Sequence, residues 1–448
     1  MTHRTESDLL GPVAVPADAL WGGQTQRGIQ NFPLDGQRTI GGFPTLVAAL
    51  LLIKKAAAIT NRDIGLLSDE QADAISASVN QLLQTPQPEH FPVHALHGGG
   101  GTSANMNVNE VLANMAEERL GGRRGEYRLV HPNDHLNLNQ STNDVYPTAC
   151  HMAVILQWPS LRRSLDRLIA ILDAKSREFQ DHRHLARTCF QDAVDIALSD
   201  FFSGYAGFLR RKLDRIGQAV GRLYAVNLGG SIIGRAEDVP PAYMEAIVPN
   251  LRQASRDPNY HQAANLFDAA QNPDDLAVVS AHLDILARGL IKITNDFRVL
   301  GSGPEAGLGE LLLPAVQPGS SAMPGKVNPV IPEFLIQLCF RVIGNHAMCT
   351  AGIDHGELDL NVWESSMVFA VLESMELIET GAAVFAERCV RGLKANAEIN
   401  EWHSRTLIPM LATLARQYGY SAVTAAYKEA DGDGERMKVL LAERSASA

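Results

Sequence analysis

At 448 residues, with 46% hydrophobic and 20% charged content, the chain has the composition of an ordinary globular protein of two or three domains. A net charge of −11 argues against general binding to nucleic acid or an anionic membrane, because phosphate contacts need a basic surface. The five cysteines include no C-x-x-C pair, which suits a reducing cytoplasm. We find no apolar signal segment and no run of eighteen apolar residues, so we expect a cytoplasmic protein without a membrane span.

The first forty residues are irregular, because glycines and prolines punctuate short apolar pieces that suit strands or turns. Beyond them, apolar residues recur at helical spacing. The predicted helices cover residues 45–61, 68–85, 105–120, 145–179, 192–226, 274–300, 331–351 and 364–393. The predicted helices from residue 145 onward are longer than the usual mean helix length of about 11 to 12 residues. Such long helices need partners on several faces, as in a long bundle that also oligomerises. Smaller helices are expected after residue 395.

One loop stands out between two of these helices. Residues 319–329 read GSSAMPGKVNP, and their glycines and prolines exclude both a helix and a central strand. The remaining side chains include two hydroxyls, an ammonium group and a carboxamide. Such a loop suits the gripping of an anion, whereas the alternative interpretation is a solvated turn.

Three further stretches combine hydroxyl and amide side chains beside apolar helices. They are residues 101–107 (GTSANMN), 139–144 (NQSTND) and 187–192 (RTCFQD). Each alone is explained by helix capping. Together, with few cations beyond Arg187 and Lys326, they indicate a pocket of mainly neutral hydrogen-bonding groups, which suits a small dianion.

This lining suggests a reaction. Abstraction of a proton next to a carboxylate creates an enediolate-like dianion, which preorganised donors and a cation must stabilise. Lys326 and Asn328 are candidates for that role, and Ser320 for the base. On chemistry alone a histidine is the better base, because a free serine hydroxyl is a very weak one.

Metal and nucleotide sites have little support in the sequence. The pair His94 and His97 lies between a proline and a glycine run, where no helix aligns the rings, so a solvated or capping role is favoured and no metal site is predicted. No H-E-x-x-H, G-x-G-x-x-G or Walker-type motif occurs.

The loop at residues 319–329 resembles the signature G-S-S-x-M-P-x-K-x-N-P of the fumarase/aspartase superfamily. The similarity covers nearly the whole chain, including residues 15–27, 101–114, 131–134, 140–144, 187–193, 227–230 and 356–364. It implies a mainly α-helical subunit of three domains (residues 1–141, 142–394 and 395–448). The central long-helix bundle of that subunit builds a homotetramer, with active sites shared between subunits and no cofactor. The implied reaction is reversible anti-elimination from a succinyl group to give fumarate.

The resemblance also implies a role for individual residues. Ser320 is expected to be the general base on a mobile loop, with Lys326 and Asn328 holding the carboxylate that becomes the enediolate. We expect Thr102, Ser141 and Thr142 to bind the other carboxylate. Asn143 and Thr188 are expected to face the leaving group. Ser103, Cys189, Ser321 and Met323 complete the predicted substrate-binding set.

Within the superfamily, Ser103, Thr142 and Glu364 resemble the aspartate ammonia-lyase branch, whereas His131 and Glu310 lie in segments that look as much like fumarase. The leading expectation is therefore an enzyme that converts L-aspartate to fumarate and ammonia.

Two departures from the family pattern leave the substrate open. Cys189 stands where relatives carry His or Gln, and we expect it to be buried and inert rather than a nucleophile. Residues 234–238 (GRAED) replace the usual G-T-G-L-N. The alternatives are a lyase acting on an N-substituted aspartate or a related amino acid, fumarate hydratase, and a catalytically dead relative, against which the intact motif residues argue.

Overall fold

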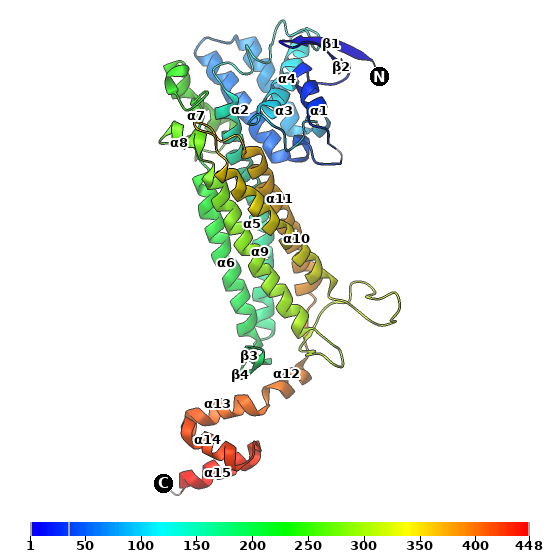
Figure 1. The fold of residues 1–448 in the computed structure, drawn as a ribbon, viewed down its shortest axis with the longest axis vertical. Coiled ribbons are helices and arrows are strands. Elements are labelled where there is room, and N and C mark those ends of the chain that lie inside the picture. Colours follow the sequence, from blue (N-terminus) through cyan, green and yellow to red (C-terminus); the bar gives the residue numbers. More distant parts are fainter. Residues whose placement is uncertain (1, 35, 447–448) are drawn as a thin grey trace. The chain divides into compact units, whose positions relative to one another are not determined.

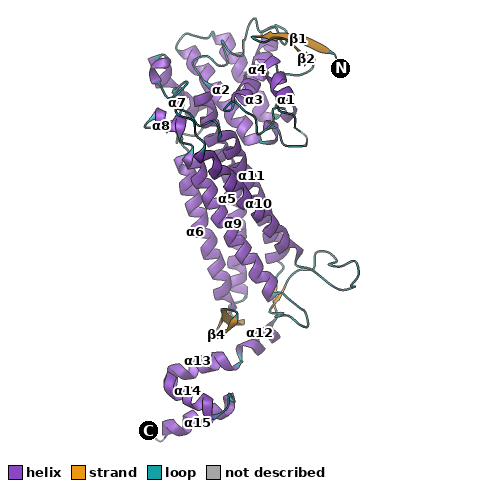
Figure 2. Cartoon of the chain, viewed as in Figure 1, coloured by secondary structure: helices purple, strands orange, loops and turns teal. Residues whose placement is uncertain are grey.

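A computed structural model describes residues 2–34 and 36–446 of the chain. The fold is mainly α-helical, as predicted, and the strands of the described residues form small two-stranded sheets (Figures 1 and 2). The helices are α1 Gly23–Asn31, α2 Pro44–Asp63, α3 Asp69–Gln84, α4 Thr102–Arg119, α5 Thr142–Glu178, α6 Leu198–Arg222, α7 Pro241–Ser255, α8 Leu266–Gln271, α9 Asp274–Leu300, α10 Val330–Asp354, α11 Glu364–Phe385, α12 Ala397–Ser404, α13 Leu407–Tyr418, α14 Tyr420–Glu429 and α15 Gly434–Ala446. The strands are β1 His3–Asp8, β2 Gly11–Pro16, β3 Arg183–Thr188, β4 Gln191–Ala197, β5 Ala225–Val226, β6 His261–Gln262, β7 Leu311–Leu312 and β8 Lys394–Ala395.

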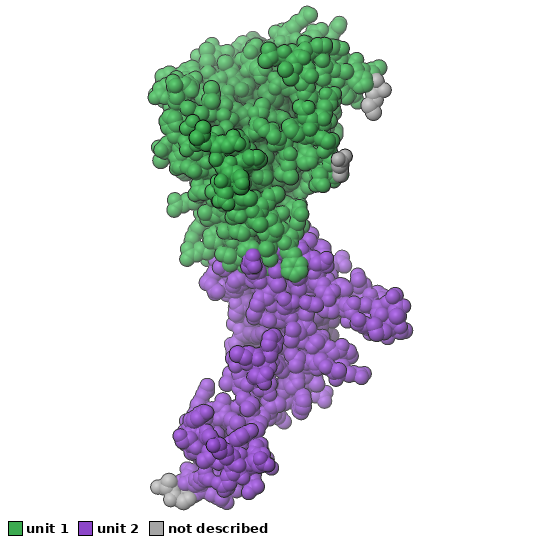
Figure 3. All heavy atoms as spheres, viewed as in Figure 1, with its two compact units in different colours: residues 1–162, 214–287, 340–378 green, residues 163–213, 288–339, 379–448 purple. Residues whose placement is uncertain are grey.

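The chain divides into two compact units, which Figure 3 colours separately. Unit 1 comprises residues 1–162, 214–287 and 340–378, and unit 2 comprises residues 163–213, 288–339 and 379–448. The long helices α5, α6, α9, α10 and α11 each contribute residues to both units. The division into three domains at residues 141 and 394 stays a prediction.

In unit 1, α2 lies at the centre of the helical packing and contacts α3 and α7, while α3 contacts α4. The start of α3 is fixed by a capping box, in which the Ser68 side chain accepts from the backbone N–H of Gln71 and the Gln71 side chain accepts from that of Ser68. By length and composition α2 is apolar enough to cross a membrane, but 67% of that window is buried inside the structure. This burial is typical of a core helix. Helix α2 also carries a fully buried lysine, Lys54.

In unit 2, a chain of aromatic side chains joins the ends of the long helices. The ring centroid of Phe202 in α6 lies 5.3 Å from that of Phe179, just beyond α5, and 5.7 Å from that of Phe297 in α9. Phe297 in turn lies 5.4 Å from Phe385 of α11. All four are buried, and at about 25 cal/mol per Å² each contributes several kcal/mol to folding.

The prediction of one helix over residues 192–226 is wrong at its start. Residues Gln191–Ala197 form β4, which pairs antiparallel with β3, and α6 begins only at Leu198. The hairpin turns at Cys189 and Phe190, whose φ angles of 54° and 59° both lie in the left-handed region. The turn lacks the Asn-Gly pattern that identifies such hairpins in a sequence, so the helical periodicity of the following residues was extended too far.

The remaining boundaries agree with the predicted pattern in most places. Short helices α12–α15 follow residue 395, as expected, and the last three pack around Val423, Ala426 and Met437. The helix predicted for residues 364–393 is shorter in the structure. Helix α11 ends at Phe385, and a π-helical turn, Ala386–Val390, follows it. Helices α1, α7 and α8 were not predicted.

Candidate active site

The signature loop lies in unit 2 between β7 and α10, and it closes on itself. The Gly319 N–H donates to the Lys326 carbonyl at 2.8 Å, and the Asn328 side-chain amide donates to the Gly319 carbonyl at 2.8 Å. A Cβ on Gly319 would lie 2.5 Å from the Asn328 backbone nitrogen, so only glycine permits this closure. The loop therefore holds both ends of the motif together.

Ser320 is held inside this closed loop. Its Oγ accepts from the backbone N–H groups of Ala322 and Met323, at 3.1 and 2.9 Å. Both N–H dipoles favour negative charge on the oxygen. Ser321, Met323 and Lys326 are exposed, and Lys326 has no carboxylate partner among the described residues. Ser320, Met323 and Lys326 line a hollow of about 410 Å³ on this loop.

The β3–β4 hairpin, also in unit 2, carries Thr188 and Cys189 at its tip. Thr188 pairs with Gln191 across the turn, and both predicted residues are exposed. The expectation of a buried Cys189 is therefore wrong. Two bulky residues in the left-handed region, Cys189 and Phe190, cost of order 1–3 kcal/mol each unless their surroundings hold them there. Such strain concentrates at functional sites.

A buried carboxylate anchors the base of this hairpin. Glu310, which is 0% exposed, receives both guanidinium nitrogens of Arg187 at 2.5 and 3.1 Å. His403 of α12 contacts the same carboxylate through Nδ1 at 2.6 Å, and Asn400 donates to the Glu310 carbonyl at 2.7 Å. Sequence reasoning missed Glu310 as a site residue, because no local motif links it to Arg187, 123 positions earlier.

In unit 1, the first predicted substrate contact stands at the N-terminus of α4. Gly99, Gly100 and Gly101 all have positive φ, and they lead directly into the exposed Thr102. A Cβ on Gly101 would lie 2.3 Å from the Tyr146 ring. The glycine run thus lets the chain pass against α5 and present Thr102 to solvent. Ser103 is half-buried.

The N-terminus of α5 presents the next three predicted residues. Ser141 caps the helix, because its Oγ accepts from the Asn143 N–H at 3.2 Å while Asp144 accepts from the Ser141 N–H at 3.0 Å. Thr142 Oγ1 accepts from the Asn105 side chain of α4 at 3.0 Å. The capping interpretation of this stretch is therefore confirmed, and the same hydrogen bonds fix the orientation of its hydroxyls.

Asn143 is engaged by the segment that precedes the sequence departure at residues 234–238. Its Nδ2 donates to the Ile232 carbonyl at 2.8 Å, and Asn227 donates to the Asn143 carbonyl at 3.2 Å. Arg235 forms an ion pair with Asp238 at 3.1 Å, so two of the three new charges neutralise each other. The departure thus continues a segment that contacts a predicted leaving-group residue.

Unit 1 also contains a buried acid, Glu364, which acts on residues of α5. Glu364 begins α11, is 5% exposed, and burial raises its pKa to about 8. Burial raises the pKa values of Tyr146 and Cys150 in α5, and Glu364 raises both further when it is ionised. Tyr146 also accepts a hydrogen bond from Ser365 at 2.9 Å. At neutral pH, Glu364 is therefore mainly a neutral carboxylic acid.

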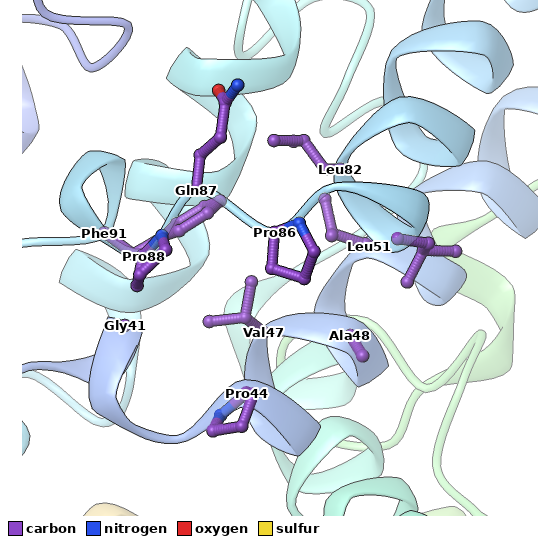
Figure 4. Close-up of a pocket in the computed structure, with 11 residues that line it drawn as sticks. Gly41, Pro44, Val47, Ala48, Leu51, Leu82, Pro86, Gln87, Pro88 and Phe91 are labelled. Carbon is purple, nitrogen blue, oxygen red and sulfur yellow. The ribbon is translucent and has the colours of Figure 1, made fainter.

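One further cavity in the described residues does not fit a dianion. A cavity of about 250 Å³ lies between α2, α3 and residues 86–91, and its lining is almost entirely apolar (Figure 4). None of the predicted site residues lines this cavity. Among the described residues, no group of three or more His, Cys, Asp and Glu side chains is arranged to hold a metal ion. His94 and His97 make local backbone hydrogen bonds instead.

The predicted residues therefore fall into two groups. Unit 1 contains Thr102, Ser103, Ser141, Thr142 and Asn143, brought together where α4 and α5 begin. Unit 2 contains Thr188, Cys189, Ser320, Ser321, Met323, Lys326 and Asn328.

With this geometry in view, comparison with known proteins defines the class. Residues 11–344 match a family profile described as Lyase. Curated relatives that align over nearly the full chain carry two kinds of name, fumarate hydratase and aspartate ammonia-lyase. The chain belongs to the fumarase/aspartase superfamily of lyases.

Two relatives illustrate how evenly the similarity is divided. The chain is 40% identical over 437 residues to the fumarate hydratase class II of Methylorubrum extorquens, covering 97% of this chain and 92% of the relative. It is also 40% identical over 443 residues to the aspartate ammonia-lyase of Pseudomonas aeruginosa, covering 99% and 93%. Overall identity therefore does not select between water and ammonia.

Solved structures agree with the fold. A crystal structure of fumarate lyase:delta crystallin from Brucella melitensis bound to cobalt has a TM-score of 0.93 and 40% identity, covering 98% of both chains. A class II fumarase from Schistosoma mansoni has a TM-score of 0.91 and 32% identity, covering 96% of this chain and 93% of that one.

Proposed function

We propose that the protein is a carbon–nitrogen lyase that converts L-aspartate to fumarate and ammonia by anti-elimination. Ser320 is the general base, and Lys326 with Asn328 holds the carboxylate next to the abstracted proton. Thr102, Ser141 and Thr142 bind the other carboxylate, while Asn143 and Thr188 face the amino group. Ser103, Cys189, Ser321 and Met323 line the same site.

The observation that carries this proposal is the environment of the Ser320 hydroxyl. Two backbone N–H groups already donate to Oγ, and the exposed ammonium of Lys326 belongs to the same closed loop. Both features favour the alkoxide over the neutral hydroxyl, and this supports serine as the base where free serine chemistry does not.

The elimination proceeds in two balanced steps. The Ser320 alkoxide takes the proton from C3 of aspartate, and the C–H electron pair moves into the adjacent carboxylate to form an enediolate-like dianion. That pair then returns to form the C2–C3 double bond, while the C2–N bond breaks and its electrons leave with ammonia. Lys326 stabilises the added negative charge of the intermediate.

The choice of ammonia as leaving group rests on three positions, Ser103, Thr142 and Glu364, which resemble the ammonia-lyase branch. The buried Glu364, which acts on Tyr146 and Cys150 of α5, is mainly neutral and so adds little negative charge there. Fumarate hydratase is the second candidate, because relatives with that name are equally similar. An N-substituted aspartate is a third, supported by the exposed Cys189 and the altered segment beside Asn143.

One assay separates these candidates. Purified protein is mixed with L-aspartate, L-malate or N-substituted aspartates, and fumarate is followed by its absorbance. We expect fumarate from aspartate. Release from malate but not from aspartate would refute the ammonia-lyase proposal, and turnover of none of them would favour a catalytically dead relative.

We further propose that the active protein is a homotetramer in the cytoplasm, with sites shared between subunits and no cofactor. The likeness of the chain to this superfamily supports the proposed assembly. Light scattering of the purified protein tests this directly, because a monomer cannot assemble a site that takes residues from more than one subunit.

A further inference from the structure

A fully buried lysine lies behind the segment proposed to bind a substrate carboxylate. Lys54 of α2 is 0% exposed, and its Nζ donates to the side-chain oxygens of Asn137 at 3.1 Å and Gln140 at 2.9 Å. It forms no salt bridge with a carboxylate among the described residues. Burying an ammonium group costs several kcal/mol, so its presence here calls for a compensating role.

The hydrogen bonds of Lys54 lead directly to the predicted site. Asn137 Oδ1 also accepts from Asn105 Nδ2 at 3.1 Å and Asn109 Nδ2 at 3.2 Å. The same Asn105 amide donates to Thr142 Oγ1 at 3.0 Å. A chain of three hydrogen bonds therefore joins the Lys54 ammonium to the Thr142 hydroxyl, and Gln140 is followed immediately by Ser141.

A second observation concerns charge. Asp144, one residue beyond Asn143, is 0% exposed and accepts from the backbone N–H groups of Ser141, Gly229 and Ser231. These hydrogen bonds favour the carboxylate, although burial raises its pKa to about 7. An uncompensated negative charge here would repel an incoming dianion. Burial lowers the pKa of Lys54 to about 7, and the negative charge of Asp144 opposes that fall, so the two groups act on each other.

We infer that Lys54 is a positioning residue of the proposed reaction. It fixes the turn of residues 136–140 from behind and offsets the charge of Asp144, so that Ser141 and Thr142 accept a substrate carboxylate. This inference rests on the proposed function for the identity of the ligand, but the fixing of the turn is a property of the free protein.

The test uses Lys54→Met and a matched control on the same helix. Lys55 also donates to a carboxamide, Asn80 Oδ1 at 2.8 Å, but this pair is exposed and lies against α3. The probe is succinate, a dianion with no group to eliminate, and its binding to the full-length protein is measured by calorimetry. Lys54→Met should weaken succinate binding about 10-fold or more, because the hydrogen bonds that the Lys54 ammonium makes to residues 137 and 140 are lost. Lys55→Met should leave it unchanged.

Kinetics and hydrogen exchange give two further readouts. Lys54→Met should raise KM by about the same factor while kcat changes less than about threefold, because the carboxylate contact is made in both ground and transition states. Amide exchange in residues 136–144 should accelerate in Lys54→Met but not in Lys55→Met. The inference is overturned if the succinate affinity, the KM and the amide exchange rates of Lys54→Met all lie within twofold of the Lys55→Met values.

A second variant covers the case in which Lys54→Met does not fold. Lys54→Gln keeps a donor without the charge, and weakened succinate binding in it supports the inference whereas unchanged binding refutes it. The two proposals fail separately. If the wild-type protein turns over none of the substrates, the proposed function falls, and the exchange comparison still decides whether Lys54 fixes the turn.

Discussion

Replacing Glu310 with glutamine should loosen the hairpin that carries Thr188 and Cys189. The Glu310 carboxylate side chain is 1% exposed and Arg187 is 16% exposed, so the ion pair is largely shielded from water. The amide of Glu310→Gln retains one oxygen as acceptor but carries no charge, which leaves the Arg187 guanidinium without its counter-ion. Breaking a buried pair by removing one partner costs about 3–5 kcal/mol.

This loss should be local, because the chain consists of two compact units and need not unfold in a single step. Hydrogen exchange of β3 and β4 amides, read by mass spectrometry, measures it. A loss of about 3 kcal/mol in the opening free energy raises the exchange rate roughly 100-fold. The kcat/KM should fall as well, because the hairpin holds Thr188.

A matched control lies on the same hairpin. Arg183 and Asp195 form an ion pair across β3 and β4, but Arg183 is 51% exposed, so Asp195→Asn should cost less than about 1 kcal/mol. In the double variant with Arg187→Met, the Glu310→Gln cost should shrink, because no buried charge remains unpaired. Exchange in Glu310→Gln no faster than in Asp195→Asn would refute the reasoning.

Three other outcomes are expected. Gly101→Ala should lower the free energy of unfolding by about 3 kcal/mol or more, because the added Cβ would lie 2.3 Å from the Tyr146 ring. Gly99→Ala meets open space and has only its φ of +86° to accommodate, so it should cost about 1 kcal/mol. Urea unfolding compares the two variants. Burial raises the pKa of Glu364 to about 8, so between pH 4.5 and 8 the folded state keeps a proton that the unfolded state releases, and the stability of the wild type falls as the pH rises. Glu364→Gln has no such loss, so urea unfolding should find it about as stable as the wild type at pH 5 and more stable at pH 8, by on the order of 4 kcal/mol. Ser320→Ala should abolish turnover while light scattering and circular dichroism stay unchanged, and near-normal activity would remove Ser320 as the base.

Much of the helical architecture was predictable from local pattern. Helix α9 was predicted with its observed bounds, and α3 begins one residue after its predicted start, because both depend on residues a few positions apart. The β3–β4 hairpin was not predictable in this way. Its turn at Cys189 and Phe190 has no favourable sequence signal, and the anchoring contact of Arg187 comes from Glu310, far along the chain.

The same distinction holds for the site. The sequence by itself determined the signature loop and the superfamily, because eleven consecutive residues carry the glycine, proline, hydroxyl and ammonium groups of the motif. Only the tertiary structure decided that Cys189 is exposed, that Glu364 is a buried acid, and that Lys54 supports Ser141 and Thr142 from behind. The physical reason is that exposure, pKa and hydrogen-bond partners depend on groups that folding brings together from distant positions, and no local pattern records them.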